Sequence, residues 1–226
     1  MGLNQDLSNF RFGRVGQQPL STERTRLLVV DRATGKMESM RFSDLPDIVK
    51  GYEVWANDSI GQHPYFKQQN FYAKNPGSYY PPTAGIPMTP ALAARMDFHL
   101  LTLHTGCPSS QDTLNSCFTT GKTFMEPYCL PNAPGKATIA LGTTVAKALE
   151  SWSLSGRLID SSDLFIRPGH KWLNVGMFLT NFHWSGESLL AMTCAFGGVE
   201  LIREAHETAY RENYGFSDYG DRLLIK

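Results

Sequence analysis

The sequence has no long apolar run that would mark a membrane protein. Its apolar stretches are short and interrupted, whereas a membrane-spanning helix needs about 20 consecutive apolar residues. The N-terminus, MGLNQD, lacks the charged and then apolar plan of a signal peptide. Asp6 stands where a myristoylation signal has Ser or Thr. These absences lead us to expect a cytoplasmic protein without a membrane partner.

The chain also lacks an excess of charge of either sign. Lys and Arg together number 21, as do Asp and Glu. Proteins that follow a nucleic-acid backbone usually carry a basic excess, because neutralising phosphates supplies much of the affinity. RNA binding would require clusters such as Arg11 with Arg14, or Arg203 with Arg211, to gather on one face. The balance therefore disfavours, without excluding, a tRNA partner.

Cysteine is scarce and its spacing indicates no metal site. Cys107, Cys117, Cys129 and Cys194 form no Cys-x-x-Cys pair and have no histidine at metal-site spacing. We therefore expect reduced thiols and no bound metal. The chain likewise shows no nucleophile elbow, phosphate-binding loop or iron–sulfur cluster motif.

The remaining pattern predicts one α/β domain over residues 1–226, with a mixed sheet and flanking helices. Apolar residues make up 42% of the 226 residues, enough for a sizeable core. The predicted strands are a hairpin over 27–42 and the segments 52–56, 98–104, 137–141, 163–167 and 177–180. The predicted helices are 91–96, 143–151, 187–196 and 199–214. Residues 105–136 read as mostly loop.

Residues 60–82 differ from the rest of the chain. They hold four prolines, several tyrosines and few aliphatic residues, so we predict a long connection with one helical turn near 65–70. Its exposed aromatic side chains could form a dimer contact or a lid over a site, with Gly77 and Gly85 as hinges.

Several short motifs occur in one order along the chain. They are RLLVVDR (26–32), ND (57–58), YAKNPGS (72–78), PTAG (82–85), GTTV (142–145), LES (149–151), DLFI (163–166), LTNFH (179–183), AFGG (195–198) and YGD (219–221). Together they resemble the S-adenosylmethionine:tRNA ribosyltransferase-isomerase family of queuosine biosynthesis. The resemblance implies a substrate, S-adenosylmethionine, whose ribose passes to a 7-aminomethyl-7-deazaguanine base in tRNA and becomes an epoxide-bearing cyclopentane. Adenine and methionine leave.

The sequence departs from this family mainly on the side of the acceptor. The family has a second, β-rich domain where residues 60–82 form a short connection. Two family histidines are replaced by Pro87 and Phe124. We therefore expect a shortened member in which the S-adenosylmethionine side is better kept than the acceptor side.

The resemblance also implies which residues bind S-adenosylmethionine. The anion-favouring start of a helix at 142–144 would hold its carboxylate or a ribose oxygen, although a plain threonine N-cap is the simpler reading of Thr143. Phe182 would stack on adenine and Asn181 would read its edge, unless Phe182 is a core residue. The full predicted set is Thr83, Ala84, Gly85, Gly142, Thr143, Thr144, Asn181, Phe182, Tyr219 and Asp221.

The chemistry calls for a base near the sulfonium, which acidifies the neighbouring ribose methylene, and an acid near adenine. Our candidates are His183 and Asp58 first, then Glu126 and His104. Each has a simpler structural reading: Asp58 and Asp221 follow turn-forming residues, and Glu126 would be an ordinary surface carboxylate.

Four functions remain open from the sequence. The neutral charge and altered acceptor side favour a transferase that acts on a small-molecule acceptor, in specialised metabolism. The alternatives are a minimal tRNA ribosyltransferase-isomerase, or a shortened site that cleaves S-adenosylmethionine to methylthioadenosine. A catalytically inactive S-adenosylmethionine-binding module is the fourth.

Overall fold

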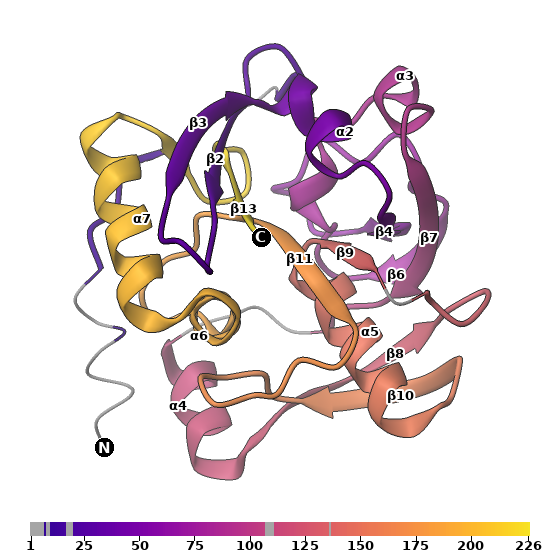
Figure 1. The fold of residues 1–226 in the computed structure, drawn as a ribbon. Helices are drawn as coiled ribbons and strands as arrows, with labels where there is room; N and C mark the ends of the chain where they lie inside the picture. Colours follow the sequence, from indigo (N-terminus) through magenta and orange to yellow (C-terminus); the bar gives the residue numbers. More distant parts are fainter. Residues whose placement is uncertain (1–6, 8–9, 17–19, 107–110, 136) are drawn as a thin grey trace.

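A computed structural model describes residues 7, 10–16, 20–106, 111–135 and 137–226. Within these residues the largest sheet has nine strands in the order β10-β8-β7-β4-β9-β11-β13-β2-β3 (Figure 1). The strands are β2 (Arg26–Val30), β3 (Met37–Arg41), β4 (Glu53–Asn57), β7 (Asp97–Leu103), β8 (Lys122–Cys129), β9 (Thr138–Leu141), β10 (Ile159–Leu164), β11 (Val175–Asn181) and β13 (Arg222–Ile225). Two short pairs, β1 (Arg14–Val15) with β12 (Gly215–Phe216) and β5 (Ser59–Gly61) with β6 (Asn75–Ser78), lie outside it.

The four central strands run parallel and end at the same edge of the sheet. β7, β4, β9 and β11 pair in parallel, while β13 pairs antiparallel to β11. The carboxyl ends of β4, β9 and β11 therefore meet the start of β13. In open α/β sheets, ligands bind in the crevice outside such carboxyl ends.

Helices and turns cover both faces of the sheet. Because successive strand residues point to opposite sides, each strand contributes to two cores. Leu28 and Val30 join one core with α4 (Gln111–Thr120), α5 (Thr143–Ser155), α6 (Ser188–Gly197) and α7 (Val199–Arg211). Leu27 and Val29 join a second core with η1 (Phe42–Asp44), α2 (Leu45–Ile48), η2 (Thr83–Gly85) and α3 (Pro90–Ala93). None of the helices in the described part of the chain is long and apolar enough to cross a membrane.

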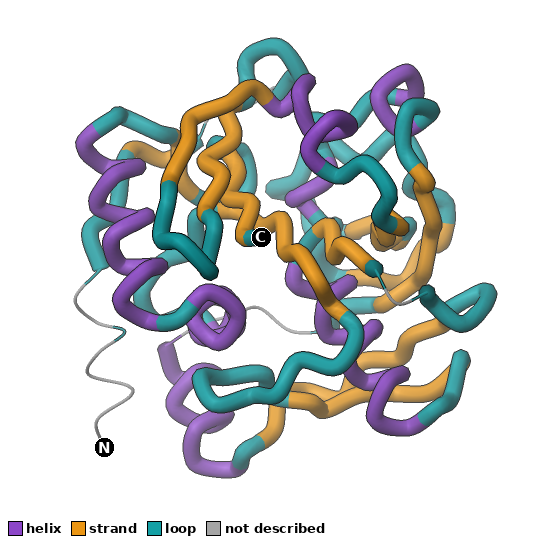
Figure 2. The backbone as a smooth tube through the Cα atoms, viewed as in Figure 1, coloured by secondary structure: helices purple, strands orange, loops and turns teal. Residues whose placement is uncertain are grey.

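The predicted mixed α/β fold is confirmed, including the hairpin, whose strands β2 and β3 are antiparallel. Thr89 caps α3 by accepting from Leu92 N, and Pro90 is its first residue. The loop-rich reading of 105–136 is wrong, because α4 and β8 occupy much of it (Figure 2). Isolated Ser, Thr and Pro residues hid that helix and strand. The helical turn near 65–70 is also wrong: no helix occurs there.

The packing of α7 yields a prediction about pH. His206 is fully buried among aromatic rings that include Phe10 and Phe182, and its Nδ1 contacts Ile202 O at 2.8 Å. Burial lowers the pKa of His206 to about 4. In the unfolded chain His206 binds a proton below about pH 6.5, whereas in the folded chain it stays neutral until the pH approaches 4. The contribution of His206 to the free energy of unfolding is therefore fully present above about pH 6.5 and is lost as the pH falls towards 4.

We expect His206→Leu to remove part of this pH dependence. Between pH 7.5 and pH 5, the wild-type free energy of unfolding should fall by about 2 kcal/mol through His206 alone. Urea unfolding of wild type and variant at both pH values measures this difference. An equal loss in both proteins would contradict the assignment to His206.

Candidate functional site

A cavity of about 380 Å³ lies at the edge where the parallel strands end. A volume of this size suits a small-molecule ligand. Among the side chains that line it are Thr83, Thr105, Thr123, Glu126, Thr143, Thr144, Lys147, Thr180, Asn181, His183, Glu187 and Asp218. These residues come from six separated stretches of the chain, which only the sheet brings together.

The turn from β9 into α5 forms one wall. Gly142 is the N-cap residue with φ +106° and ψ 161°, a conformation that essentially only glycine adopts. Thr143 and Thr144 are therefore the first residues of the helix, and the simpler reading of Thr143 as a cap is wrong. Backbone N–H groups of a first helical turn lack partners inside the helix. Asn57 fixes this turn to β4 by donating to Thr144 Oγ1 at 3.1 Å.

A buried arginine fastens a second wall. Arg222, which is 0% exposed, donates to Ala84 O at 2.9 Å, Thr83 O at 2.8 Å and Gly220 O at 2.5 Å. Burial lowers the pKa of Arg222 to about 10, so the side chain stays charged at neutral pH. The guanidinium thus joins the η2 turn to the loop before β13.

The polar side chains on this wall form a directional chain. Asn181 Nδ2 donates to Thr83 Oγ1 at 2.8 Å, and Thr83 Oγ1 donates to Asp218 Oδ1 at 2.9 Å. Burial raises the pKa of Asp218, against the lowering effect of the Thr83 hydrogen bond. Asn181 Oδ1 is buried without a partner among the described residues. A buried acceptor of this kind calls for a donor, which a ligand in the cavity would supply.

A histidine with two partners lies on the same side. His183, 8% exposed, contacts Thr180 Oγ1 through Nε2 at 2.8 Å and Glu187 Oε2 through Nδ1 at 3.1 Å. Because both ring nitrogens are engaged, the ring is held in one orientation.

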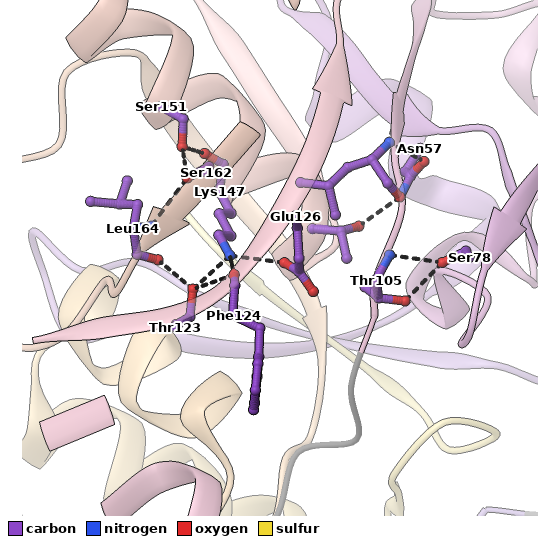
Figure 3. Close-up of polar contacts among 12 residues, drawn as sticks. Asn57, Ser78, Thr105, Thr123, Phe124, Glu126, Lys147, Ser151, Ser162 and Leu164 are labelled. Carbon is purple, nitrogen blue, oxygen red and sulfur yellow. Dashed lines mark hydrogen bonds and ion pairs between the residues drawn. The ribbon is translucent and has the colours of Figure 1, made fainter. Parts of the chain in front are cut away.

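A buried ion pair between Lys147 and Glu126 also lines the cavity (Figure 3). Lys147 Nζ contacts Glu126 Oε2 at 2.8 Å and donates to Thr123 Oγ1 at 2.6 Å and Phe124 O at 3.2 Å. The side chains of Lys147 and Glu126 are 6% and 13% exposed. No hydrogen bond to Glu126 Oε1 is found among the described residues, so this oxygen can accept from a ligand.

The structure places two predicted catalytic residues outside the cavity. Asp58 is buried directly after β4, where its carboxylate accepts from Thr102 and Asn75 and pairs with Lys74 at 3.3 Å. His104 packs near Gly77. Neither lines the cavity, whereas His183 and Glu126 both do.

Four of the predicted S-adenosylmethionine-binding residues also lie outside it. Phe182 is fully buried against Tyr214 and Phe216, so its ring is not available to stack on adenine. Asp221 accepts from Arg26 and from the backbone N–H of Gly215. The other two are Gly85, where a Cβ would lie 1.9 Å from the Tyr72 hydroxyl oxygen, and Tyr219, which packs behind Phe66.

Sequence reasoning missed Lys147, Glu187 and Asp218. Lys147 lies one helical turn after Thr143, so the periodicity of the predicted helix could have placed it beside the cavity. Asp218 directly precedes the YGD motif. Glu187 carried no signal, because its position depends on how the chain folds back between β11 and α6.

Other candidate ligand groups lie elsewhere. Glu53, Asp97 and His99 place ligand atoms within 4.8 Å of one another and could hold a metal ion. They lie at the starts of β4 and β7, the opposite edge from the cavity. Cys117, Cys129 and Cys194 are free thiols, and Cys107 lies outside the described residues.

Comparison with known proteins connects this geometry to one family. A sequence model of the family described as queuosine biosynthesis protein matches residues 54–225. The S-adenosylmethionine:tRNA ribosyltransferase-isomerase of Rubrobacter xylanophilus is 36% identical over 168 residues, which cover 70% of this chain and 50% of that protein. The enzyme of the same name from Chlorobaculum parvum is 30% identical over 256 residues, covering 93% and 74%.

A solved structure supports the fold. The crystal structure of S-adenosylmethionine tRNA ribosyltransferase from Thermotoga maritima matches with a TM-score of 0.65 at 19% identity, covering 95% of this chain and 96% of that one. The chain spans about half the length of the first curated relatives it matches.

These comparisons correct one expectation. The small-molecule acceptor inferred from the neutral charge, the shortened connection and the altered acceptor-side residues is wrong, because the relatives are named for tRNA. Net charge sums over the whole chain and carries no information about where the charges lie, so it was a poor guide to the partner.

The role of Arg222 can be tested by its removal. Arg222→Met removes the guanidinium that donates to the carbonyl oxygens of Thr83, Ala84 and Gly220, and we expect the free energy of unfolding to fall by about 3 kcal/mol or more. Arg95→Met is the control, since Arg95 only pairs with exposed Asp47 and should cost at most about 1 kcal/mol. Urea unfolding measures both, and similar small losses would refute the fastening role.

Proposed function

Because the chain belongs to the queuosine biosynthesis protein family, we propose that it is an enzyme that transfers and isomerises the ribosyl group of S-adenosylmethionine onto a base of tRNA. The observation that carries the proposal is the charge pattern of the cavity. Carboxylates from Glu126, Glu187 and Asp218 share it with the start of α5. A ligand with separate positive and negative groups fits such a site.

S-adenosylmethionine has these features. Its sulfonium and ammonium are cations, which carboxylates attract in a partly buried site. Its carboxylate suits the first turn of α5, where N–H groups and the helix dipole favour an anion. Asn181 Oδ1, buried without a described partner, would accept from the adenine amino group or a ribose hydroxyl. These residues support S-adenosylmethionine as a substrate.

We assign proton abstraction beside the sulfonium to Glu126. The competing candidate, His183, has both ring nitrogens engaged by Thr180 and Glu187. Glu126 is held through Oε2 by Lys147, and Oε1 has no hydrogen bond among the described residues, so it is able to accept a substrate proton. Lys147 acts as a positioning residue that orients the Glu126 carboxylate.

Product analysis tests the proposal. Incubation with S-adenosylmethionine and tRNA carrying 7-aminomethyl-7-deazaguanine should release adenine and methionine, with a matching mass increase in the modified nucleoside. Glu126→Gln should slow adenine release by about 10²- to 10⁴-fold. Glu38→Gln, on an exposed strand, is the matched control. Methylthioadenosine in place of adenine would contradict the proposed bond cleavage.

The raised pKa of Asp218 gives a pH-dependent test of binding. Asp218 attracts a cation only when ionised, so S-adenosylmethionine should bind more weakly as the pH falls from 7.5 to 5. Asp218→Asn can still accept from Thr83 but has no charge. We expect about 10- to 100-fold weaker binding at pH 7.5 and less pH dependence.

Isothermal titration calorimetry at both pH values measures these affinities. Asp47→Asn, an exposed change far from the cavity lining, should match wild type. Unchanged affinity in Asp218→Asn would rule out contact between this carboxylate and the substrate cation.

A further inference from the structure

The segment 60–82 builds one side of the cavity. His63, Tyr65, Phe66 and Tyr80 all line it, and we refer to these four residues as the aromatic wall. His63, Tyr65 and Phe66 lie in the connection between β5 and β6, and Tyr80 follows β6. All four belong to the stretch where the sequence predicted a shortened connection. The feature is therefore local to this segment and independent of the polar groups described above.

The aromatic wall is a packed unit. Phe66 meets Tyr80 edge to face with ring centres 5.4 Å apart, and His63 lies 5.1 Å from Tyr80. Tyr219 supports Phe66 from behind at 6.0 Å. The backbone helps to fix the segment, because His63 N donates to Tyr79 O at 2.9 Å. Such mutual packing holds the rings in place before a ligand arrives.

The wall is open to solvent at its outer end. Tyr65 is 56% exposed, and Phe124, which lines the cavity from β8, is 51% exposed. Asn181 and Thr83, in contrast, are 4% and 7% exposed. Buried polar groups and buried apolar side chains thus line the interior of the cavity, and exposed aromatic rings lie at its mouth. Exposed aromatic side chains that gather at one place mark a binding surface.

We propose that the aromatic wall stacks the acceptor nucleobase of an RNA. This inference rests on the proposed function and names the part of the site that receives the second substrate. A base offers a flat π-face to each ring and needs no charged partner, and the wall contains no Lys, Arg, Asp or Glu. Its outer position favours a base arriving from solvent over the adenine of a substrate bound deeper.

The position of the aromatic wall also suits the binding of an RNA base by the short connection over residues 60–82. Single-stranded bases in RNA loops are recognised largely by stacking on aromatic side chains. A base that undergoes chemistry must leave its stack and enter a pocket. The aromatic wall would replace the lost base stacking at the entrance of the cavity that Glu126 also lines.

Fluorescence of a stacked base tests the inference without turnover. The probe is an RNA hairpin with 2-aminopurine in its loop, whose emission falls when the base stacks on an aromatic ring. We expect wild type to quench it, and to quench the same hairpin much less with 2-aminopurine in the stem. Tyr65→Ala should bind the loop probe about 5- to 100-fold more weakly, whereas Tyr65→Phe should remain close to wild type.

Phe71→Ala is the matched control, since Phe71 is 46% exposed in the same segment but does not line the cavity. Calorimetry with S-adenosylmethionine accompanies each variant. If Tyr65→Ala weakens the binding of S-adenosylmethionine as much as the binding of RNA, the aromatic wall holds adenine and the inference is overturned. Equal RNA binding by wild type, Tyr65→Ala and Phe71→Ala also overturns it. If the wild-type protein does not bind S-adenosylmethionine, the proposed function is refuted instead.

Discussion

A buried guanidinium determines the shape of the cavity. Arg222 joins two chain segments more than a hundred residues apart by donating to carbonyl oxygens of Thr83, Ala84 and Gly220. A buried charge is costly unless it is fully hydrogen-bonded, so these loops have little freedom to separate. The chain from Asn181 through Thr83 to Asp218 depends on that fixed geometry.

The sheet supplies the second constraint. Parallel β4, β9 and β11 end at one edge. Asn57 and Asn181, the last residues of β4 and β11, and Gly142, which follows β9, therefore lie at this edge. Gly142 adopts a conformation that a side chain would strain, which lets α5 start directly at the cavity. Lys147 then reaches Glu126 from the next turn of the helix.

The cavity offers two physically different environments. Its interior contains charged groups in fixed partnerships, where low exposure strengthens electrostatic attraction. Its mouth consists of aromatic rings that hold each other in place. An ionic nucleoside substrate suits the first environment and a planar base suits the second. A chain with no net charge can therefore contain strongly polar local surfaces.

The sequence alone determined the α/β class, most helices and strands, the family and part of the site. Local signals sufficed there: an apolar run for β2, alternation for β3, Thr89 and Pro90 for α3, and Gly142 before a helix. The pattern could not show that Phe182 belongs to the core, that Asp58 is tied to Thr102, or that Lys147 and Asp218 line the cavity. Those outcomes depend on which strands become neighbours and which way each side chain points, and both are set by long-range packing that short sequence motifs do not encode.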